Sequence, residues 1–213
     1  IEPTVSATEA AVSITGSSAT SGGTISSNGG SIVTVSGIVW STTSTPTISL
    51  ATKTTNGAAT GTYTSSLTGL APATLYYVRA YATNSIGTAY GPQSNFTTLA
   101  IAPTISATAS ATSITSSTAT IGGAITSDGG AAITSRGVVY GTSSGSATYS
   151  ATSGTGTGTY TLSLIGLTPA TTYFVRSFAT NSVGTVYGTE TNFTTIRVNP
   201  AWFMCSIGIK YNF

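Results

Sequence analysis

The sequence predicts an all-β protein built from two similar domains in tandem, and three observations support this fold class. A stretch of 25 residues occurs twice, as LTGLAPATLYYVRAYATNSIGTAYG from Leu67 to Gly91 and as LIGLTPATTYFVRSFATNSVGTVYG from Leu164 to Gly188. The composition is typical of strands and turns, with abundant Thr, Val, Ile and Tyr and 25 glycines. No segment carries the periodicity of an amphipathic helix.

The length of 213 residues suits two domains and a short tail, because the two copies stand 97 residues apart, from Leu67 to Leu164. We therefore expect one domain over residues 1–98, a second over residues 99–196 and a C-terminal strand over residues 197–213. Ser and Thr make up about a third of the chain, yet 39% hydrophobic content and regular alternation argue against disorder.

Charge and cysteine usage exclude several classes of protein. The net charge of +2 comes from six scattered cations, so the sequence offers no basic patch for a nucleic acid. No apolar run reaches the roughly 18 residues of a transmembrane helix, and the given residues do not show the pattern of a signal peptide, so we expect none among them. Ile1 matches Ile101, so the sequence begins at a repeat boundary, as expected for a processed end or a piece of a longer array. Cys205 is the single cysteine and is interpreted as a small buried apolar residue.

Each copy opens with a segment that contains a proline, Pro3 or Pro103, which suits the start of a strand at a sheet edge. A series of further strands is predicted after it. In the first copy the strands are expected at residues 13–15, 19–25, 32–40, 61–64, 76–83 and 90–96. In the second copy they are expected around Ile114 and at 119–125, 132–140, 158–161, 173–180 and 187–193. Asn28 and Asp128, each followed by two glycines, predict tight turns. Residues 41–61 vary most in length between copies and predict a loop or a weak edge strand.

The strand inside the repeated stretch divides into two faces, because side chains alternate along an extended chain. We assign one set to the core: Tyr76, Val78, Ala80 and Ala82, with Tyr173, Val175, Ser177 and Ala179 in the second copy. The other set predicts an aromatic–Arg–aromatic stripe on the sheet surface, where a guanidinium can stack on rings. This candidate binding stripe comprises Tyr77, Arg79, Tyr81, Phe174, Arg176 and Phe178.

A family resemblance rests on the same stretch. Leu70-Ala71-Pro72 before Tyr76 resembles the tyrosine corner of β-sandwiches, in which a tyrosine hydroxyl bonds to backbone a few residues upstream. The run L-x-P-x-T-x-Y-x-V-R-x-x-A-x-N-x-x-G-x-x-Y-G, ending in Phe-Thr-Thr, resembles the fibronectin type III family, in particular the variant found in surface and secreted proteins of Bacteroidota, where SDGG and RGVVY segments recur. The resemblance implies an immunoglobulin-like β-sandwich for each domain and no chemistry. It departs in strand B, which lacks tryptophan, while an aromatic residue lies on strand C (Trp40, Tyr140).

The inventory of reactive side chains favours a protein that is not an enzyme and has no cofactor and no metal. There is no histidine, the commonest general base and metal ligand. The four carboxylates are Glu2, Glu9, Asp128 and Glu190. Asn28 replaces Asp128 in the first copy and Gln93 replaces Glu190, so these two positions work without a charge and predict structural roles.

The C-terminal tail predicts a β-strand with one apolar face, because residues alternate from Phe203 onward. The candidate assembly residues are Phe203, Cys205, Ile207, Ile209, Tyr211 and Phe213. Three interpretations remain open. The strand can be donated to a neighbouring copy in a head-to-tail polymer, or add as an extra edge strand to its own second domain. It also resembles the terminal strand signal of outer-membrane β-barrels, whose other strands would come from other chains.

These observations together predict a non-enzymatic structural protein of the bacterial cell surface or extracellular space. We expect a subunit of a filament or adhesin-like fibre that self-associates through its C-terminal strand. Two alternatives remain. One is a spacer or carbohydrate-binding accessory module of a secreted hydrolase, with a glycan or other cell-surface partner on the aromatic stripe. The other is a surface module attached to the outer membrane.

Overall fold

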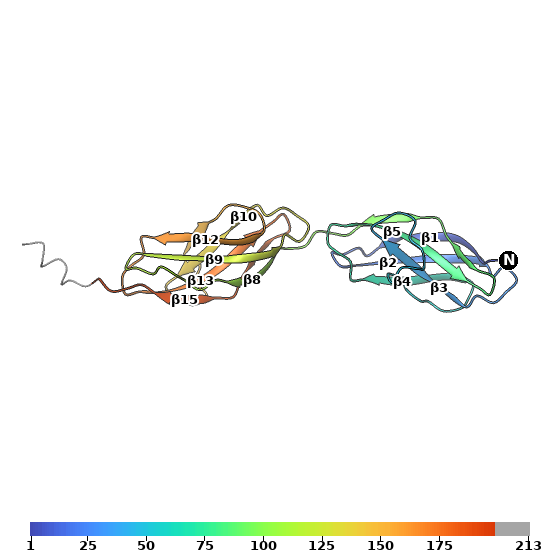
Figure 1. The fold of residues 1–213 in the computed structure, drawn as a ribbon, viewed down its shortest axis with the longest axis horizontal. Helices are drawn as coiled ribbons and strands as arrows, with labels where there is room; N and C mark the ends of the chain where they lie inside the picture. Colours follow the sequence, from blue (N-terminus) through green and yellow to red (C-terminus); the bar gives the residue numbers. More distant parts are fainter. Residues whose placement is uncertain (199–213) are drawn as a thin grey trace, which may run out of the picture. The chain divides into compact units, whose positions relative to one another are not determined.

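The structure is a computed structural model that describes residues 1–198. The chain divides into two compact units, unit 1 from Ile1 to Ile101 and unit 2 from Ala102 onward. The predicted boundary after residue 98 lies close to this division. Within the described residues every regular element is a β-strand, and each unit is a sandwich of two antiparallel sheets (Figure 1). The predicted fold class, all-β with two tandem immunoglobulin-like sandwiches, is therefore confirmed.

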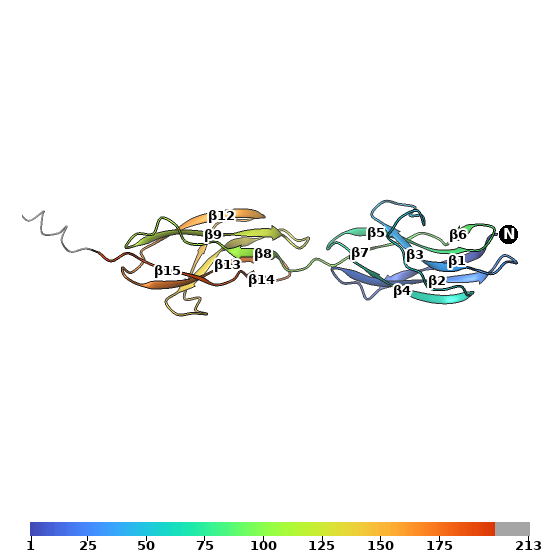
Figure 2. The same ribbon diagram turned by 60° about the horizontal axis from the view of Figure 1, so that its bottom comes forward.

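Unit 1 contains seven strands in two sheets (Figure 2). The first sheet has the order β1-β2-β4, with β1 at Thr4–Val12, β2 at Ser18–Ser27 and β4 at Gly61–Thr68. The second sheet has the order β3-β5-β6, with β3 at Val35–Ser41, β5 at Leu75–Thr83 and β6 at Thr88–Tyr90. β7, at Ser94–Thr97, also pairs with β5.

Unit 2 repeats this arrangement with one additional strand. Its first sheet has the order β12-β9-β8, with β8 at Thr104–Thr108, β9 at Thr118–Ser127 and β12 at Gly158–Ile165. Its second sheet has the order β11-β10-β13-β14, with β10 at Ser135–Gly141, β11 at Tyr149–Thr152, β13 at Thr172–Thr180 and β14 at Thr185–Tyr187. β15, at Thr191–Thr194, pairs with β13.

The core of each unit consists of the inward side chains of both sheets. Large buried side chains of this core in unit 1 include Ile25, Ile38, Leu67 and Val78, and the matching residues in unit 2 are Ile125, Val138, Leu164 and Val175. The predicted core face of β5, from Tyr76 to Ala82, is confirmed, because all four of its side chains are buried. In unit 2 the buried hydroxyl of Ser177 lies 3.0 Å from the Thr108 hydroxyl, which satisfies the polar group inside the core.

A tyrosine joins the two sheets of each sandwich from inside. The Tyr63 hydroxyl on β4 donates to the Gly37 carbonyl on β3 at 2.7 Å, and Tyr160 donates to Gly137 in the same way. Gly23 leaves room for this ring, since a Cβ there would lie 2.9 Å from the Tyr63 hydroxyl and 2.5 Å from the Ala80 side chain. Burial raises the pKa of Tyr63 to about 12, although backbone hydrogen bonds oppose the shift.

The tyrosine corner is present in both units. The Ala71 N–H donates to the Tyr76 hydroxyl at 2.9 Å, and the Thr168 N–H donates to Tyr173 at 3.0 Å. Each tyrosine ring also stacks on a phenylalanine of the last strand, with ring centroids 5.8 Å apart in both units (Tyr76–Phe96 and Tyr173–Phe193). The repeated stretch thus ties the turn before β5 or β13 to the final strand.

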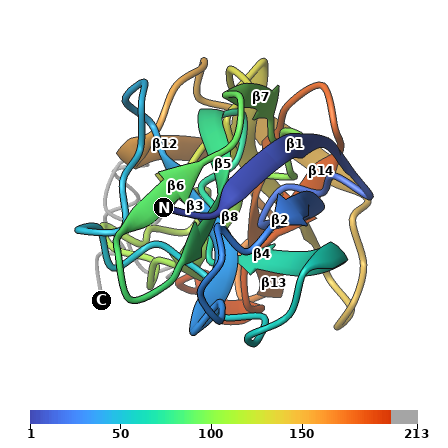
Figure 3. The ribbon, with the colours of Figure 1, turned by 90° about the vertical axis from the view of Figure 1, so that its right-hand side faces the viewer.

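Two sequence predictions about strand positions were wrong. Residues 13–15 do not form the first strand, because β1 ends at Val12 and Ser13 adopts a positive φ of 50° that turns the chain. The first strand lies earlier and bends, with register shifts between Thr4 and Ala7. It thereby reaches the second sheet beside β6 (Figure 3), where the Ala80 N–H donates to the Thr8 hydroxyl at 2.8 Å.

The last predicted strand is also divided. Residues 90–96 belong to two short strands, β6 and β7, separated by Gly91-Pro92-Gln93. Pro92 has no N–H to continue a ladder, and Gly91 lies so close to β1 that a Cβ there would be 2.7 Å from the Thr8 hydroxyl. The chain crosses beside β1 at this break, and unit 2 has the same break at residues 188–190.

Candidate functional site

The structure places the six stripe residues on β5 and β13 but does not leave all of them on the surface. Tyr81 is only 2% exposed and Phe178 9% exposed, so the prediction of a surface position is wrong for both. The Tyr81 hydroxyl donates to the Thr54 carbonyl at 2.7 Å, beneath the segment that follows β3. Tyr77, Arg79, Phe174 and Arg176 are half-buried.

The two arginines stack across strands and not along their own strand. The Arg79 guanidinium lies 4.5 Å from the centre of the Tyr90 ring on β6, and its Nε donates to the Gly91 carbonyl at 3.2 Å. Arg176 lies 5.1 Å from the Tyr187 ring and donates to Gly188 at 3.1 Å. Tyr90 pairs with Tyr81 and Tyr187 pairs with Phe178, so each arginine reaches diagonally across the strand pair to its ring, within the reach of a long side chain. Each arginine therefore fastens the strand break at Gly91 or Gly188.

A covering segment packs over part of the outer face of the second sheet in unit 1. This segment, residues 42–57, is bridged to β3 through Val39–Lys53 and Ser36–Gly57. Its Ile48 N–H donates to the Tyr90 hydroxyl at 3.0 Å. Val39, which points to this outer face beside Arg79, is fully buried. The predicted loop or weak edge strand at 41–61 thus covers part of the aromatic face.

The same face of unit 2 is half-open. The matching segment is three residues shorter, and its loop of residues 142–148 has no large apolar side chain in place of Pro46, Ile48 and Leu50 of unit 1. Tyr187 is 47% exposed, and Val139 is half-buried where Val39 is fully buried. The exposed part of this face in unit 2 is therefore centred on Tyr187, with Phe174 and Arg176 half-buried beside it, a different set from the predicted stripe.

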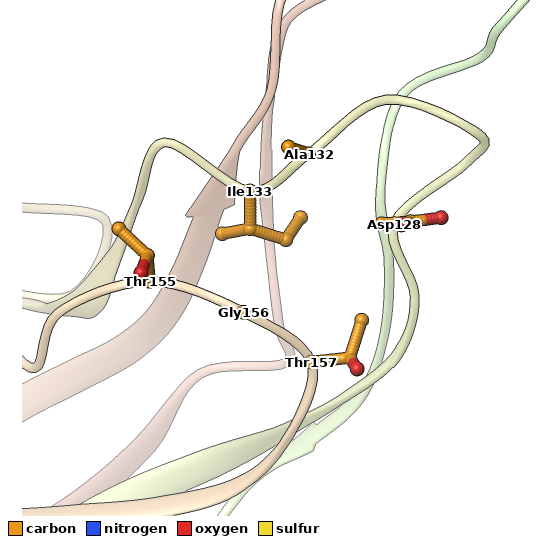
Figure 4. A pocket seen from close by; sticks show the side chains of 6 residues that line it. All are labelled: Asp128, Ala132, Ile133, Thr155, Gly156 and Thr157. Atoms are coloured by element: carbon orange, nitrogen blue, oxygen red, sulfur yellow. The ribbon is translucent and has the colours of Figure 1, made fainter.

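A shallow hollow lies at one end of each unit, between the turn after the second strand and the loop before β4 or β12. In unit 2 it measures about 290 Å³ and is lined by Asp128, Ala132, Ile133, Thr155, Gly156 and Thr157 (Figure 4). The Asp128 carboxylate points away from Ile133, and its Oδ1 accepts the Gly130 N–H at 2.9 Å. The hollow in unit 1, about 260 Å³, has Asn28 at the matching place. Asp128 and Asn28 thus shape a turn, and neither hollow gathers several ionisable groups.

Glu190 and Gln93 also have matching structural roles. The Glu190 carboxylate accepts the Ser144 hydroxyl at 2.7 Å and the Gly145 N–H at 2.8 Å, and these hydrogen bonds lower its pKa. In unit 1 the Gln93 side-chain oxygen accepts the Thr45 N–H, which is the matching loop amide. Over residues 1–198 no three His, Cys, Asp or Glu side chains gather as a metal site, and no membrane-spanning helix is found.

The free edges of β4 and β12 differ between the units. In unit 1 the Thr54 hydroxyl donates to the Ser65 hydroxyl at 2.9 Å, and the Asn56 amide donates to the Thr64 carbonyl at 2.6 Å. In unit 2 Leu162 occupies the place of Ser65 and is half-buried against the core. Sequence reasoning missed this difference, although the exchange of Ser65 for Leu162 was its visible signal.

The predicted assembly residues Phe203, Cys205, Ile207, Ile209, Tyr211 and Phe213 lie outside the described residues. The C-terminal strand therefore stays a prediction. The last described contacts of the chain are made by Ile196, whose N–H donates to the Thr115 carbonyl at 3.0 Å and whose carbonyl accepts the Ala170 N–H at 3.4 Å.

Comparison with known proteins identifies the fold. No protein-family model and no curated protein matches the chain. Among solved structures it is similar to the FN1–FN3 domains of chicken CNTN1, with a TM-score of 0.51 and 16% identity over 91% of this chain and 67% of that chain. That neighbour is a tandem of fibronectin type III domains. The chain described here therefore has the fold of two fibronectin type III-like sandwiches in tandem.

Proposed function

We propose that the chain is a non-catalytic structural module of a bacterial surface or extracellular fibre, and that copies join through the C-terminal segment. The observation that carries this proposal is the alternation of apolar side chains from Phe203 to Phe213, because such a segment can add to a sheet edge that covers its apolar face. An uncovered edge is a template for another strand. The free edge of β12, an unbroken strand that contains the half-buried Leu162, is one edge where this segment can add.

The use of polar groups in the described units supports a structural role. Arg79 and Arg176 fasten strand breaks, while Asp128 and Glu190 hold turns and loops. The matching positions of unit 1 replace both acids with amides, so a catalytic acid or base at either place would have no counterpart in the repeat.

Removal of residues 199–213 tests the proposal. We expect the full chain to form large species in size-exclusion chromatography and fibres in electron microscopy, and the chain 1–198 to stay monomeric. Fibres that persist without the C-terminal segment would exclude strand donation. A full chain that stays monomeric at high concentration would exclude the fibre.

The half-open face of unit 2 favours a second candidate function, binding of carbohydrate as a module of a secreted hydrolase. Tyr187 is exposed beside Arg176 and Phe174, a combination of ring and planar polar group that suits a sugar. Loss of binding to insoluble polysaccharide on Tyr187→Ala, with no loss on Tyr90→Ala in the partly covered unit 1, would support this candidate. Equal binding by wild type and both variants, or none, would exclude it.

A further inference from the structure

We infer that the free edge of β12 is the acceptor for residues 203–213 of a neighbouring copy, an inference that rests on the proposed function. Natural proteins protect the unpaired N–H and C=O groups of edge strands with bulges, prolines, charges or covering segments. An edge without such protection in an otherwise protected unit is therefore a candidate docking place for a strand.

The other edges of the two sandwiches carry protection. β1 and β8 follow a proline and contain register shifts, at Val5–Ala7 and at Ile105–Ala107. The covering segment lies along β3. β6, β7, β14 and β15 are strands of three or four residues divided at Gly91 and Gly188, and β11 has four residues. Only short lengths of backbone are open there.

The edge of β4 is continuous but guarded by side chains. Backbone carbonyls alternate in direction along a strand, and the Thr64 carbonyl accepts the Asn56 amide, so it points away from β2. Beside it the Ser65 hydroxyl is bound by Thr54. An incoming strand would have to displace this polar cluster before it could pair with β4.

The edge of β12 has no such guard along residues 161–165. At the start of the strand the Arg136 guanidinium lies 5.0 Å from the Tyr160 ring, and its Nη1 donates to the Gly156 and Thr157 carbonyls. β12 pairs with β9 over eight residues without a register shift, and its sequence GTYTLSLI holds no charge and no proline. Thr161 occupies the place of Thr64, since both face a glycine of the second strand, Gly122 or Gly22. Within residues 1–198 no hydrogen bond reaches the outward carbonyl of Thr161. Leu162 is half-buried and Ile165 is 74% exposed, so the edge is also apolar.

The C-terminal segment fits this edge in length and position. Eleven residues from Phe203 to Phe213 reach about 36 Å when extended, enough to cover the roughly 26 Å of β12. Ile196 is bonded to Thr115 and Ala170, and Leu167, two residues after β12, is bonded to Ser117. The chain therefore leaves unit 2 beside the C-terminal end of β12. From there a strand can run antiparallel along a β12 edge and cover Leu162. If the C-terminal segment pairs with β12 of a neighbouring copy, it makes the same contacts that it would make with β12 of its own chain.

The single native cysteine provides the test. Leu162→Cys in the full chain places a second thiol at the β12 edge, and Ser65→Cys places one at the matching position of β4. A disulfide to Cys205 requires Cα atoms within about 7 Å. After mild oxidation we expect covalent multimers on a non-reducing gel for Leu162→Cys and none beyond the unmodified background for Ser65→Cys. Thr161→Pro, which blocks the outward N–H without touching the ladder to β9, should abolish assembly, and Thr64→Pro should not.

The outcomes separate this inference from the proposed function. Covalent multimers through position 162 support both. A disulfide within single chains would overturn exchange between copies and with it the fibre. Tail-dependent fibres that resist Thr161→Pro and give no cross-link at position 162 would overturn β12 as the acceptor and leave the proposed function standing.

Discussion

Unit 1 and unit 2 share one fold and a similar core, yet they differ in how far the outer face of the second sheet and the edge of β4 or β12 are exposed. In unit 1 the covering segment buries Tyr81 and Val39, and Asn56 guards the edge of β4. In unit 2 a shorter segment leaves Tyr187 half exposed, and Leu162 lies at an unguarded edge. The difference teaches that the repeated stretch specifies the sandwich, while the variable segment and single exchanges decide which surface can bind.

The largest expected effect concerns the partly covered face of unit 1. Tyr81→Ala should lower the free energy of unfolding of unit 1 by about 3–5 kcal/mol, because it leaves a cavity and frees the Thr54 carbonyl. The matched Phe178→Ala should cost less, because Phe178 has no hydroxyl that bonds a carbonyl and is 9% exposed where Tyr81 is 2% exposed. Hydrogen exchange followed by mass spectrometry in urea reports each unit separately. Equal losses in the two units would contradict the contrast.

The tyrosine between the sheets gives the next effect. Tyr63→Phe should cost about 1–3 kcal/mol, because the Gly37 carbonyl loses its donor inside the sandwich. Burial raises the pKa of Tyr63 from 10.0 to about 12, so its contribution is complete below pH 10 and is lost as the pH rises towards 12. Urea unfolding at pH 8 and pH 11 should therefore show a smaller alkaline loss for the variant. An unchanged alkaline loss would show that Tyr63 does not cause it.

The arginine contacts should have a smaller effect. Arg79→Ala removes the stacking on Tyr90 and the hydrogen bond to Gly91, together worth about 1–2 kcal/mol. Arg176→Ala should cost less, because Tyr187 is more exposed than Tyr90. Relative to wild type, Arg79→Ala should increase the amide hydrogen exchange rate of Thr88–Tyr90 more than Arg176→Ala increases that of Thr185–Tyr187. The opposite order would place the stronger contact in the open unit.

The smallest effect is at Glu190, where only unit 2 carries a charge. The Ser144 hydroxyl and the Gly145 N–H lower the pKa of this carboxyl. Its contribution to stability is therefore present above the ordinary pKa of 4.5 and is lost as the pH falls below it. Glu190→Gln, which copies Gln93, should reduce the difference in thermal midpoint between pH 7 and pH 3. An unchanged difference would exclude Glu190 as its source.

The sequence predicted what depends on local pattern and missed what depends on neighbours. Alternation identified the core face of β5, and the Leu-x-Pro spacing identified the corner tyrosines Tyr76 and Tyr173. Burial of Tyr81 could not be predicted, because it depends on the path of a covering segment without periodicity. The stacking of Arg79 on Tyr90 depends on the pairing of β5 with β6, which one strand alone does not specify.

Amide hydrogen exchange at the edges of β12 and β4 tests most directly the central claim that β12 accepts the C-terminal segment of a neighbouring copy. The amides of Thr161 and Ser163 point outward from β12, as Thr64 does from β4, so in the chain 1–198 Thr161 and Ser163 should exchange fast. In the assembled full chain we predict strong protection of Thr161 and Ser163 and unchanged exchange at Thr64. Equally fast exchange at Thr161 in both chains would contradict the account.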